Sequence, residues 1–175
     1  VVLASVTAIG GGTLRDMILD LPVFWVQDPS FFYVIILAAF STIMWLRSKD
    51  TFPLRYLFFA DAFGLAFFNV MGLQKALTYG AFPLIAIALG TMTAVFGGLI
   101  RDVICREIPM VLKGELYATA CIIGGGSYIL GFQLGLSTIS CMIIGFCITL
   151  ACRLCAMKWH WHLPIFNPHD SVKDE

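Results

Sequence analysis

The sequence predicts an all-α polytopic membrane protein, built as an inverted repeat of three-helix units followed by a final helix. Composition is the first reason, since 59% of the 175 residues are hydrophobic, only 13% are charged, and mean hydropathy is +0.90. Soluble domains are about half apolar and about one quarter charged. The second reason is three stretches without Asp, Glu, Lys or Arg, at 29–46, 76–100 and 116–152. The third is a motif near the amino terminus that recurs later in the chain.

About six of seven expected spans lie within this sequence, because a spanning helix needs about 20 mainly apolar residues. Breaks at glycine, proline and charged residues place them at 1–21, 31–46, 55–78, 83–105, 114–132 and 136–157. Runs such as YVIILAAF are apolar on every face and lack the two-residue alternation of a β-barrel strand. We therefore expect one transmembrane domain at 1–157, with repeats at 1–50 and 55–132, a last helix at 136–157 and a tail at 158–175.

The charged links give these helices one orientation. Basic residues gather around Arg47, around Lys113 and in the tail, whereas the alternate links 20–28, 79–82 and 131–135 contain no Lys or Arg. The positive-inside rule therefore places both ends of the chain in the cytoplasm.

The recurring motif is LASVTAIGGGTLRDMILDLP at 3–22 and LGTMTAVFGGLIRDVICREIP at 89–109. Identical residues stand 86 positions apart, as Arg15 and Arg101 do, and the pairs are Thr7 with Thr93, Gly11 with Gly97, Gly12 with Gly98, Arg15 with Arg101, and Asp16 with Asp102. Because the charge rule makes the two helices run in opposite directions, this is an inverted-topology repeat. The second copy follows a helix at 55–78, so we expect about one further spanning segment, of roughly 20 residues, before Val1.

Glycines stand close to charge in both copies. Gly10, Gly11 and Gly12 precede Arg15, and Gly97 and Gly98 precede Arg101, with Phe96 in the place of Gly10. Glycine in a membrane helix allows either close helix packing or an opened backbone whose carbonyl groups line a cavity. The adjacent charges favour the second use, so we expect these glycines to kink the helices along a permeation path. For 124–126, a glycine run without charge, packing is the expected use.

The charges within the apolar stretches need partners. Arg15, Asp16, Arg101 and Asp102 would each cost several kcal/mol if isolated in hydrocarbon. Adjacent helical side chains point about 100° apart, so we expect each charge to find its partner outside its own dipeptide. Pairing between the two copies and extension of the charges to the membrane surface are the alternatives.

Asp61 and Lys75 are two further charges of one helix. They stand 14 residues apart, or about 21 Å at 1.5 Å per residue, and either line a pore or anchor the helix at the two membrane surfaces. The side-chain oxygens that could line a pore or bond the backbone are those of Ser5, Thr7, Thr91, Thr93 and Asn69.

Several classes of function lack support. The chain contains no Gly-x-Ser-x-Gly, His-Glu-x-x-His or phosphate-loop motif, so we expect no enzyme. Its net charge of zero gives no electrostatic basis for nucleic-acid binding. Cys152 and Cys155 precede His160 and His162, but their spacing matches no zinc pattern. We therefore expect neither a metal nor another cofactor apart from a transported ion.

The doubled Gly-Gly-x-x-Arg-Asp motif and the inverted three-plus-three arrangement resemble the bacterial trimeric intracellular cation (TRIC) channels, a family also described as glycine transporters. The likeness extends from Val1 to about Met157. It implies a homotrimer in a bacterial inner membrane, in contact with lipids, with one potassium-permeable pore per protomer lined by the helices at 1–21 and 83–105. The alternative function is a transporter of glycine or another small zwitterion, which would use the same inverted-repeat site. Phe96 departs from the family's glycine pattern and could narrow that path.

Overall fold

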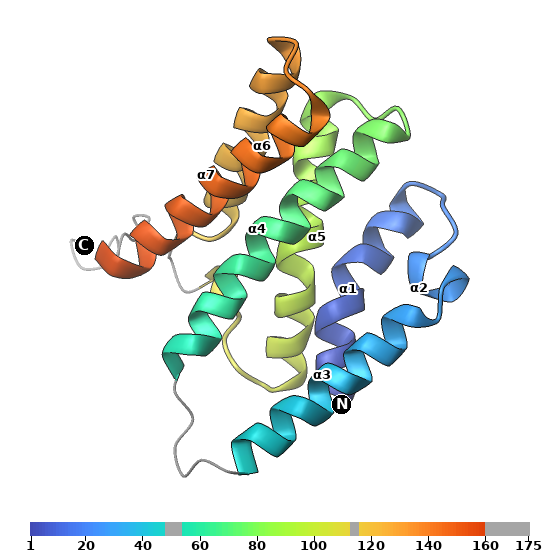
Figure 1. Cartoon of the computed structure of the whole chain (residues 1–175), viewed down its shortest axis with the longest axis vertical. Helices are drawn as coiled ribbons and strands as arrows, with labels where there is room; N and C mark the ends of the chain where they lie inside the picture. Colours follow the sequence, from blue (N-terminus) through green and yellow to red (C-terminus); the bar gives the residue numbers. More distant parts are fainter. Residues whose placement is uncertain (48–53, 113–115, 160–175) are drawn as a thin grey trace, which may run out of the picture.

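The computed structural model describes residues 1–47, 54–112 and 116–159, and this part of the chain is helical (Figure 1). Six long helices are α1 (Val2–Ile18), α3 (Ser30–Arg47), α4 (Leu54–Thr78), α5 (Pro83–Ile104), α6 (Ala118–Gln133) and α7 (Thr138–Trp159). A short helix follows each copy of the motif, namely α2 (Phe24–Gln27) and the 3-10 turn η1 (Met110–Leu112). The all-α class and the six long helices are as predicted. The expected start at 114 and most of the tail lie outside the described residues.

The long helices pack around the pair α4 and α5. Helices α6 and α7 pack against one side of this pair, and α1 packs against α5 on the other side, with α3 next to α1 (Figure 1). The largest cluster of buried apolar side chains lies where α4, α5, α6 and α7 meet, and includes Leu73, Leu89, Tyr128 and Cys141. By length and composition, α5 and α7 qualify as membrane spans among the described helices, and Ser30–Met44 is a shorter apolar helix.

The glycines of the motif bring α1 and α5 into close contact. A Cβ atom added to Gly11 would lie 2.1 Å from the carbonyl oxygen of Thr93, and one added to Gly97 would lie 2.3 Å from that of Thr7. Thr7 faces Gly97 and Gly11 faces Thr93. Contacts later in α1 thus fall earlier in α5, so the two helices run in opposite directions. Small residues permit such a close approach of backbones.

The backbone does not unwind at these glycines, and a kink there stays a prediction. Both helices stay α-helical through Gly10, Gly11 and Gly12 and through Gly97 and Gly98. A glycine weakens a helix by only about 1 kcal/mol, and the contact between α1 and α5 holds the backbone in place. Gly11 and Gly97 therefore serve packing, the use expected only for the run at 124–126.

Both copies of the motif end their helices in the same way. Asp20 and Arg106 have left-handed backbones, with φ of 53° and 57°. The N–H of Leu21 donates to the carbonyl of Asp16 at 2.8 Å, and the N–H of Glu107 donates to that of Asp102 at 2.9 Å. These are Schellman caps, which usually contain glycine at the left-handed residue.

Candidate functional site

A cavity of about 950 Å³ runs along α1 and α4. Its lining follows one face of α1 from Leu3 past Gly11 to Arg15, and one face of α4 from Asp61 past Gly64 to Lys75. Thr93, Ala94, Gly98 and Arg101 of α5 contribute as well. Because α1 and α4 supply residues over most of their lengths, the cavity extends along most of these two helices. We call its two ends the Lys75 end, which includes Arg15, and the Asp61 end, which includes Arg101 and Tyr117.

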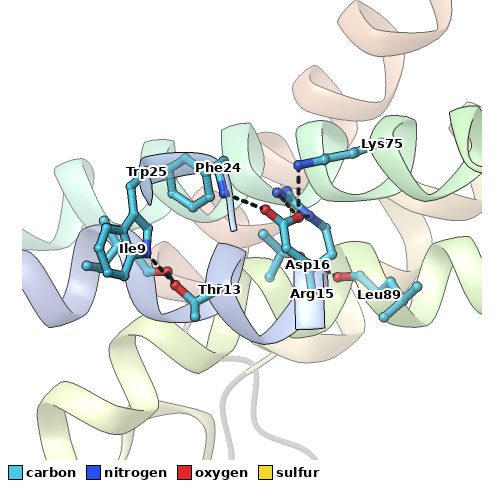
Figure 2. Close-up of polar contacts among 9 residues, drawn as sticks. Ile9, Thr13, Arg15, Asp16, Phe24, Trp25, Lys75 and Leu89 are labelled. Atoms are coloured by element: carbon cyan, nitrogen blue, oxygen red, sulfur yellow. Dashed lines mark hydrogen bonds and ion pairs between the residues drawn. The ribbon is translucent and has the colours of Figure 1, made fainter. Parts of the chain in front are cut away.

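Asp16 is the centre of the polar contacts at the Lys75 end (Figure 2). Its Oδ1 accepts hydrogen bonds from Arg15 Nε at 2.9 Å and Nη2 at 2.7 Å, and lies 2.9 Å from Lys75 Nζ. Its Oδ2 accepts the backbone N–H of Phe24 at 3.0 Å. The Asp16 side chain is fully buried, and that of Lys75 is 27% exposed. Two cations thus share one carboxylate at this end of the cavity.

Asp102 makes the corresponding contacts at the Asp61 end. Its Oδ1 accepts Arg101 Nε and Nη2, each at 2.8 Å, and its Oδ2 accepts the backbone N–H of Met110 at 3.1 Å. The acceptor and the backbone donor are eight residues apart in both copies. Each aspartate therefore holds the first residue of the short helix that follows its motif.

The expectation that each charge pairs outside its own dipeptide is wrong for both arginines. Arg15 pairs with Asp16 and Arg101 with Asp102, because the long guanidinium side chain curves back although the two Cβ atoms diverge. No pair joins the two copies of the motif among the described side chains. Lys75 is the additional partner of Asp16, and the sequence did not predict this contact across 59 positions, from 16 to 75.

The short helix α2 closes over the α1 glycines at the Lys75 end. A Cβ atom on Gly12 would lie 2.6 Å from Phe24 Cε1, so this glycine makes room for the aromatic ring. Trp25 Nε1 donates to Thr13 Oγ1 at 2.9 Å (Figure 2). Sequence analysis missed α2, although the proline before each short helix, at Pro22 and Pro109, was a signal for a new element.

The predicted site residues divide into two groups. Those that line the cavity are Thr7, Gly11, Gly12, Arg15, Asp61, Lys75, Thr93, Gly98 and Arg101. Those outside its lining are Ser5, Gly10, Asp16, Asn69, Thr91, Phe96, Gly97 and Asp102. The hydroxyls of Thr7, Thr91 and Thr93 donate to backbone carbonyls four residues earlier, at 2.6–2.9 Å, as Thr side chains in helices often do.

Asn69 joins three helices and lies away from the cavity. Its Nδ2 donates to the carbonyl oxygen of Cys121 at 2.9 Å and to Thr149 Oγ1 at 3.2 Å. The side chain is fully buried and links α4 to α6 and α7, so it does not supply the pore oxygen that the sequence predicted.

Metal ligands do not gather in the described part of the chain. No three His, Cys, Asp or Glu side chains within 1–47, 54–112 and 116–159 are close enough to hold a metal ion. Cys152 and Cys155 are free thiols, and His160 and His162 lie outside the described residues.

Comparison with known sequences places the chain among bacterial membrane proteins. The family model described as "Glycine transporter" matches residues 1–47 and 58–133. The UPF0126 inner membrane protein YadS of Escherichia coli K12 is 48% identical over 169 residues, which cover 94% of this chain and 81% of YadS. A UPF0126 membrane protein of Vibrio cholerae is 48% identical over 166 residues, which cover 94% of this chain and 70% of that protein.

Comparison with solved structures agrees. A TRIC trimeric intracellular cation channel orthologue from Rhodobacter sphaeroides superposes with a TM-score of 0.84 at 35% identity, covering 90% of this chain and 81% of that one. A second structure, of a TRIC cation channel, has a TM-score of 0.81 at 32% identity, covering 93% and 80%. The resemblance inferred from the doubled motif is thereby confirmed. The chain belongs to the membrane-protein family that unites the TRIC cation channels with the UPF0126 inner membrane proteins.

Proposed function

We propose that this protein is a homotrimeric channel through which monovalent cations, mainly K⁺, pass along the cavity of each protomer. The observation that carries the proposal is the extent of the cavity, from Asp61 and Arg101 at one end to Lys75 and Arg15 at the other. Relatives of similar fold are described as cation channels, which supports the same use here.

The middle of the cavity supports passage of a small ion. Gly11 and Gly64 contribute no side chain between the two ends, and the charged lining residues stand at the ends themselves. The two lining arginines each contact a carboxylate, Asp16 or Asp102, which offsets their charge. A cation in the path therefore meets two neutralised guanidinium groups.

The second candidate function is transport of glycine or another small zwitterion. The surplus positive charge of Arg15 and Lys75 around Asp16 favours it, because these groups could bind a carboxylate. Asp61, the lining carboxylate that could bind the amino group, stands 14 residues from Lys75 on α4, which is about 21 Å along the helix. One glycine molecule cannot contact both groups, so the geometry favours the channel.

Gly64 allows a direct test of the cavity as the path. A Cβ atom at this residue has no neighbour within 4 Å, so the side chain of Gly64→Leu would enter the cavity without displacing a helix. We expect purified Gly64→Leu in liposomes to lose most of the K⁺ flux of the wild type. The matched control is Gly126→Leu on α6, which also has open space around its Cβ but lies outside the cavity lining.

Labelled glycine uptake is measured on the same liposomes. The channel is supported if Gly64→Leu blocks the K⁺ flux, Gly126→Leu keeps it, and no saturable glycine uptake accompanies it. Saturable uptake of glycine without K⁺ flux would support the transporter. Equal K⁺ flux in both variants would mean that ions do not pass along this cavity.

A further inference from the structure

Asp61 differs from the other two carboxylates near the cavity. Both oxygens of Asp16 and both oxygens of Asp102 accept hydrogen bonds from an arginine side chain or a backbone N–H. Asp61 Oδ1 accepts one hydrogen bond, from the Tyr117 hydroxyl at 3.3 Å. Its Oδ2 is buried and has no donor among the described residues. Asp61 also lines the cavity, which Asp16 and Asp102 do not.

A buried carboxylate oxygen without a donor is unfavourable, and such groups usually mark an ion, a water or a functional role. Hard monovalent cations take oxygen ligands, and a carboxylate supplies both an oxygen and a negative charge. Arg101, the nearest lining cation, already binds Asp102 Oδ1 at 2.8 Å. The charges of Arg101 and Arg153 also act on Asp61, but neither of them donates to its Oδ2 in the described structure. Asp61 is therefore the carboxylate that this end of the cavity presents to an ion.

Tyr117 fixes the direction of this carboxylate. Its side chain precedes α6, is 4% exposed, and donates to Asp61 of α4. The guanidinium carbon of Arg153 lies 4.7 Å from the centre of the Tyr117 ring, a cation–π contact that holds the ring. Arg153 belongs to α7 and is 1% exposed. Residues from α4, from the start of α6 and from α7 thus meet here. Together they fix the Asp61 oxygen to which Tyr117 donates.

We propose that Asp61 is the residue that selects cations over anions in the cavity, and that Tyr117 is its positioning residue, held by Arg153. This inference rests on the proposed channel function and names the site that gives it charge selectivity. The Asp61 carboxylate attracts the permeating cation at the Asp61 end of the cavity, which this side chain lines, while the hydroxyl of Tyr117 holds Oδ1. Helix α7, which lies outside both copies of the motif, thereby acts on the path through Arg153 and Tyr117.

The test measures the reversal potential of the wild type and of variants in a KCl gradient, which gives the K⁺ to Cl⁻ permeability ratio. Asp61→Asn should lower this ratio roughly tenfold, which corresponds to about 1.4 kcal/mol of lost attraction. The control Glu107→Gln removes an exposed carboxylate from the link after α5 and should leave the ratio unchanged. Tyr117→Phe keeps the ring under Arg153 but removes the hydroxyl, and should lower the ratio by a smaller factor.

The double variant separates positioning from a general structural effect. If Tyr117 acts through Asp61, Tyr117→Phe has no further effect once Asp61→Asn is present. An unchanged ratio in Asp61→Asn would overturn the proposal while leaving the channel function intact. A further loss in the double variant would overturn the role of Tyr117.

A binding measurement decides the site independently of conduction. Crystals of the wild type and of Asp61→Asn are grown with Tl⁺, a heavy monovalent cation, and examined by anomalous scattering. We expect a Tl⁺ peak in contact with Asp61 in the wild type and none in the variant. A Tl⁺ peak at Asp61 in a protein that conducts no cation would refute the channel but support the cation site. Absence of that peak from the wild type would refute the cation site.

Discussion

At the scale of single residues, glycine decides how closely α1 and α5 approach. Gly11 meets the carbonyl oxygen of Thr93, and Gly97 meets that of Thr7, so the two copies of the motif make the same contact with each other. Gly12 makes room for Phe24, and Gly64 borders open space. Four glycines that look alike in the sequence therefore do three different things.

We expect Gly11→Ala to destabilise the protein by about 1–3 kcal/mol, the usual cost of overpacking. The added methyl group would lie 2.1 Å from a backbone oxygen that cannot rotate away, so α1 and α5 must separate. Thermal unfolding in detergent measures the effect as a lower melting temperature. Gly126→Ala is the control, since its Cβ meets nothing within 4 Å and alanine favours a helix over glycine. Equal melting temperatures for the two variants would contradict this account of Gly11.

At the scale of elements, each copy of the motif is a helix, a left-handed cap and a short helix held by an aspartate. Helices α4 and α6 end on Gly80 and Gly135, with φ of 83° and 79°, whereas α1 and α5 end on Asp20 and Arg106. Left-handed backbone costs a residue with a side chain roughly 1–2 kcal/mol, and aspartate tolerates it better than arginine does. Arg106 is therefore the more strained of the two caps.

Replacing this arginine should stabilise the protein. Arg106→Gly removes the strain at φ 57° without loss of packing, because the side chain is exposed. We expect a gain of about 1 kcal/mol, or roughly 2–4 °C in melting temperature. Glu107→Gly, at a neighbouring residue without positive φ, should give no gain. The explanation fails if both variants lower the melting temperature alike.

At the scale of the whole molecule, the relatives with this fold include trimeric channels, and we expect this protein to be a trimer too. Native mass spectrometry in detergent should give a mass of about three times that of one chain. Gly64→Leu should give the same mass, because Gly64 lines the protomer's own cavity and has open space around its Cβ. A monomer as the sole species of the wild type would contradict the prediction.

Local patterns in the sequence were sufficient for the class of protein and for most of its elements. The lengths of apolar runs and the breaks at glycine, proline and charge predicted six long helices, because a spanning helix needs a minimum apolar length and ends where such residues occur. The doubled motif also pointed to the family. The charges at 15, 16, 101 and 102 were recognised as needing partners, since isolated charge in hydrocarbon is costly.

Only the tertiary structure decided which groups meet. Local pattern does not reveal that Lys75 of α4 reaches Asp16 of α1, or that Asn69 turns away from the cavity. It also does not reveal that Gly11 packs against α5 whereas Gly64 has open space beside it. These outcomes depend on how helices distant in the sequence are placed and rotated against one another, and a single helix can present several apolar faces equally well. The composition and spacing of residues thus determined that this is a helical membrane protein of the TRIC family, and helix packing decided where its cavity runs.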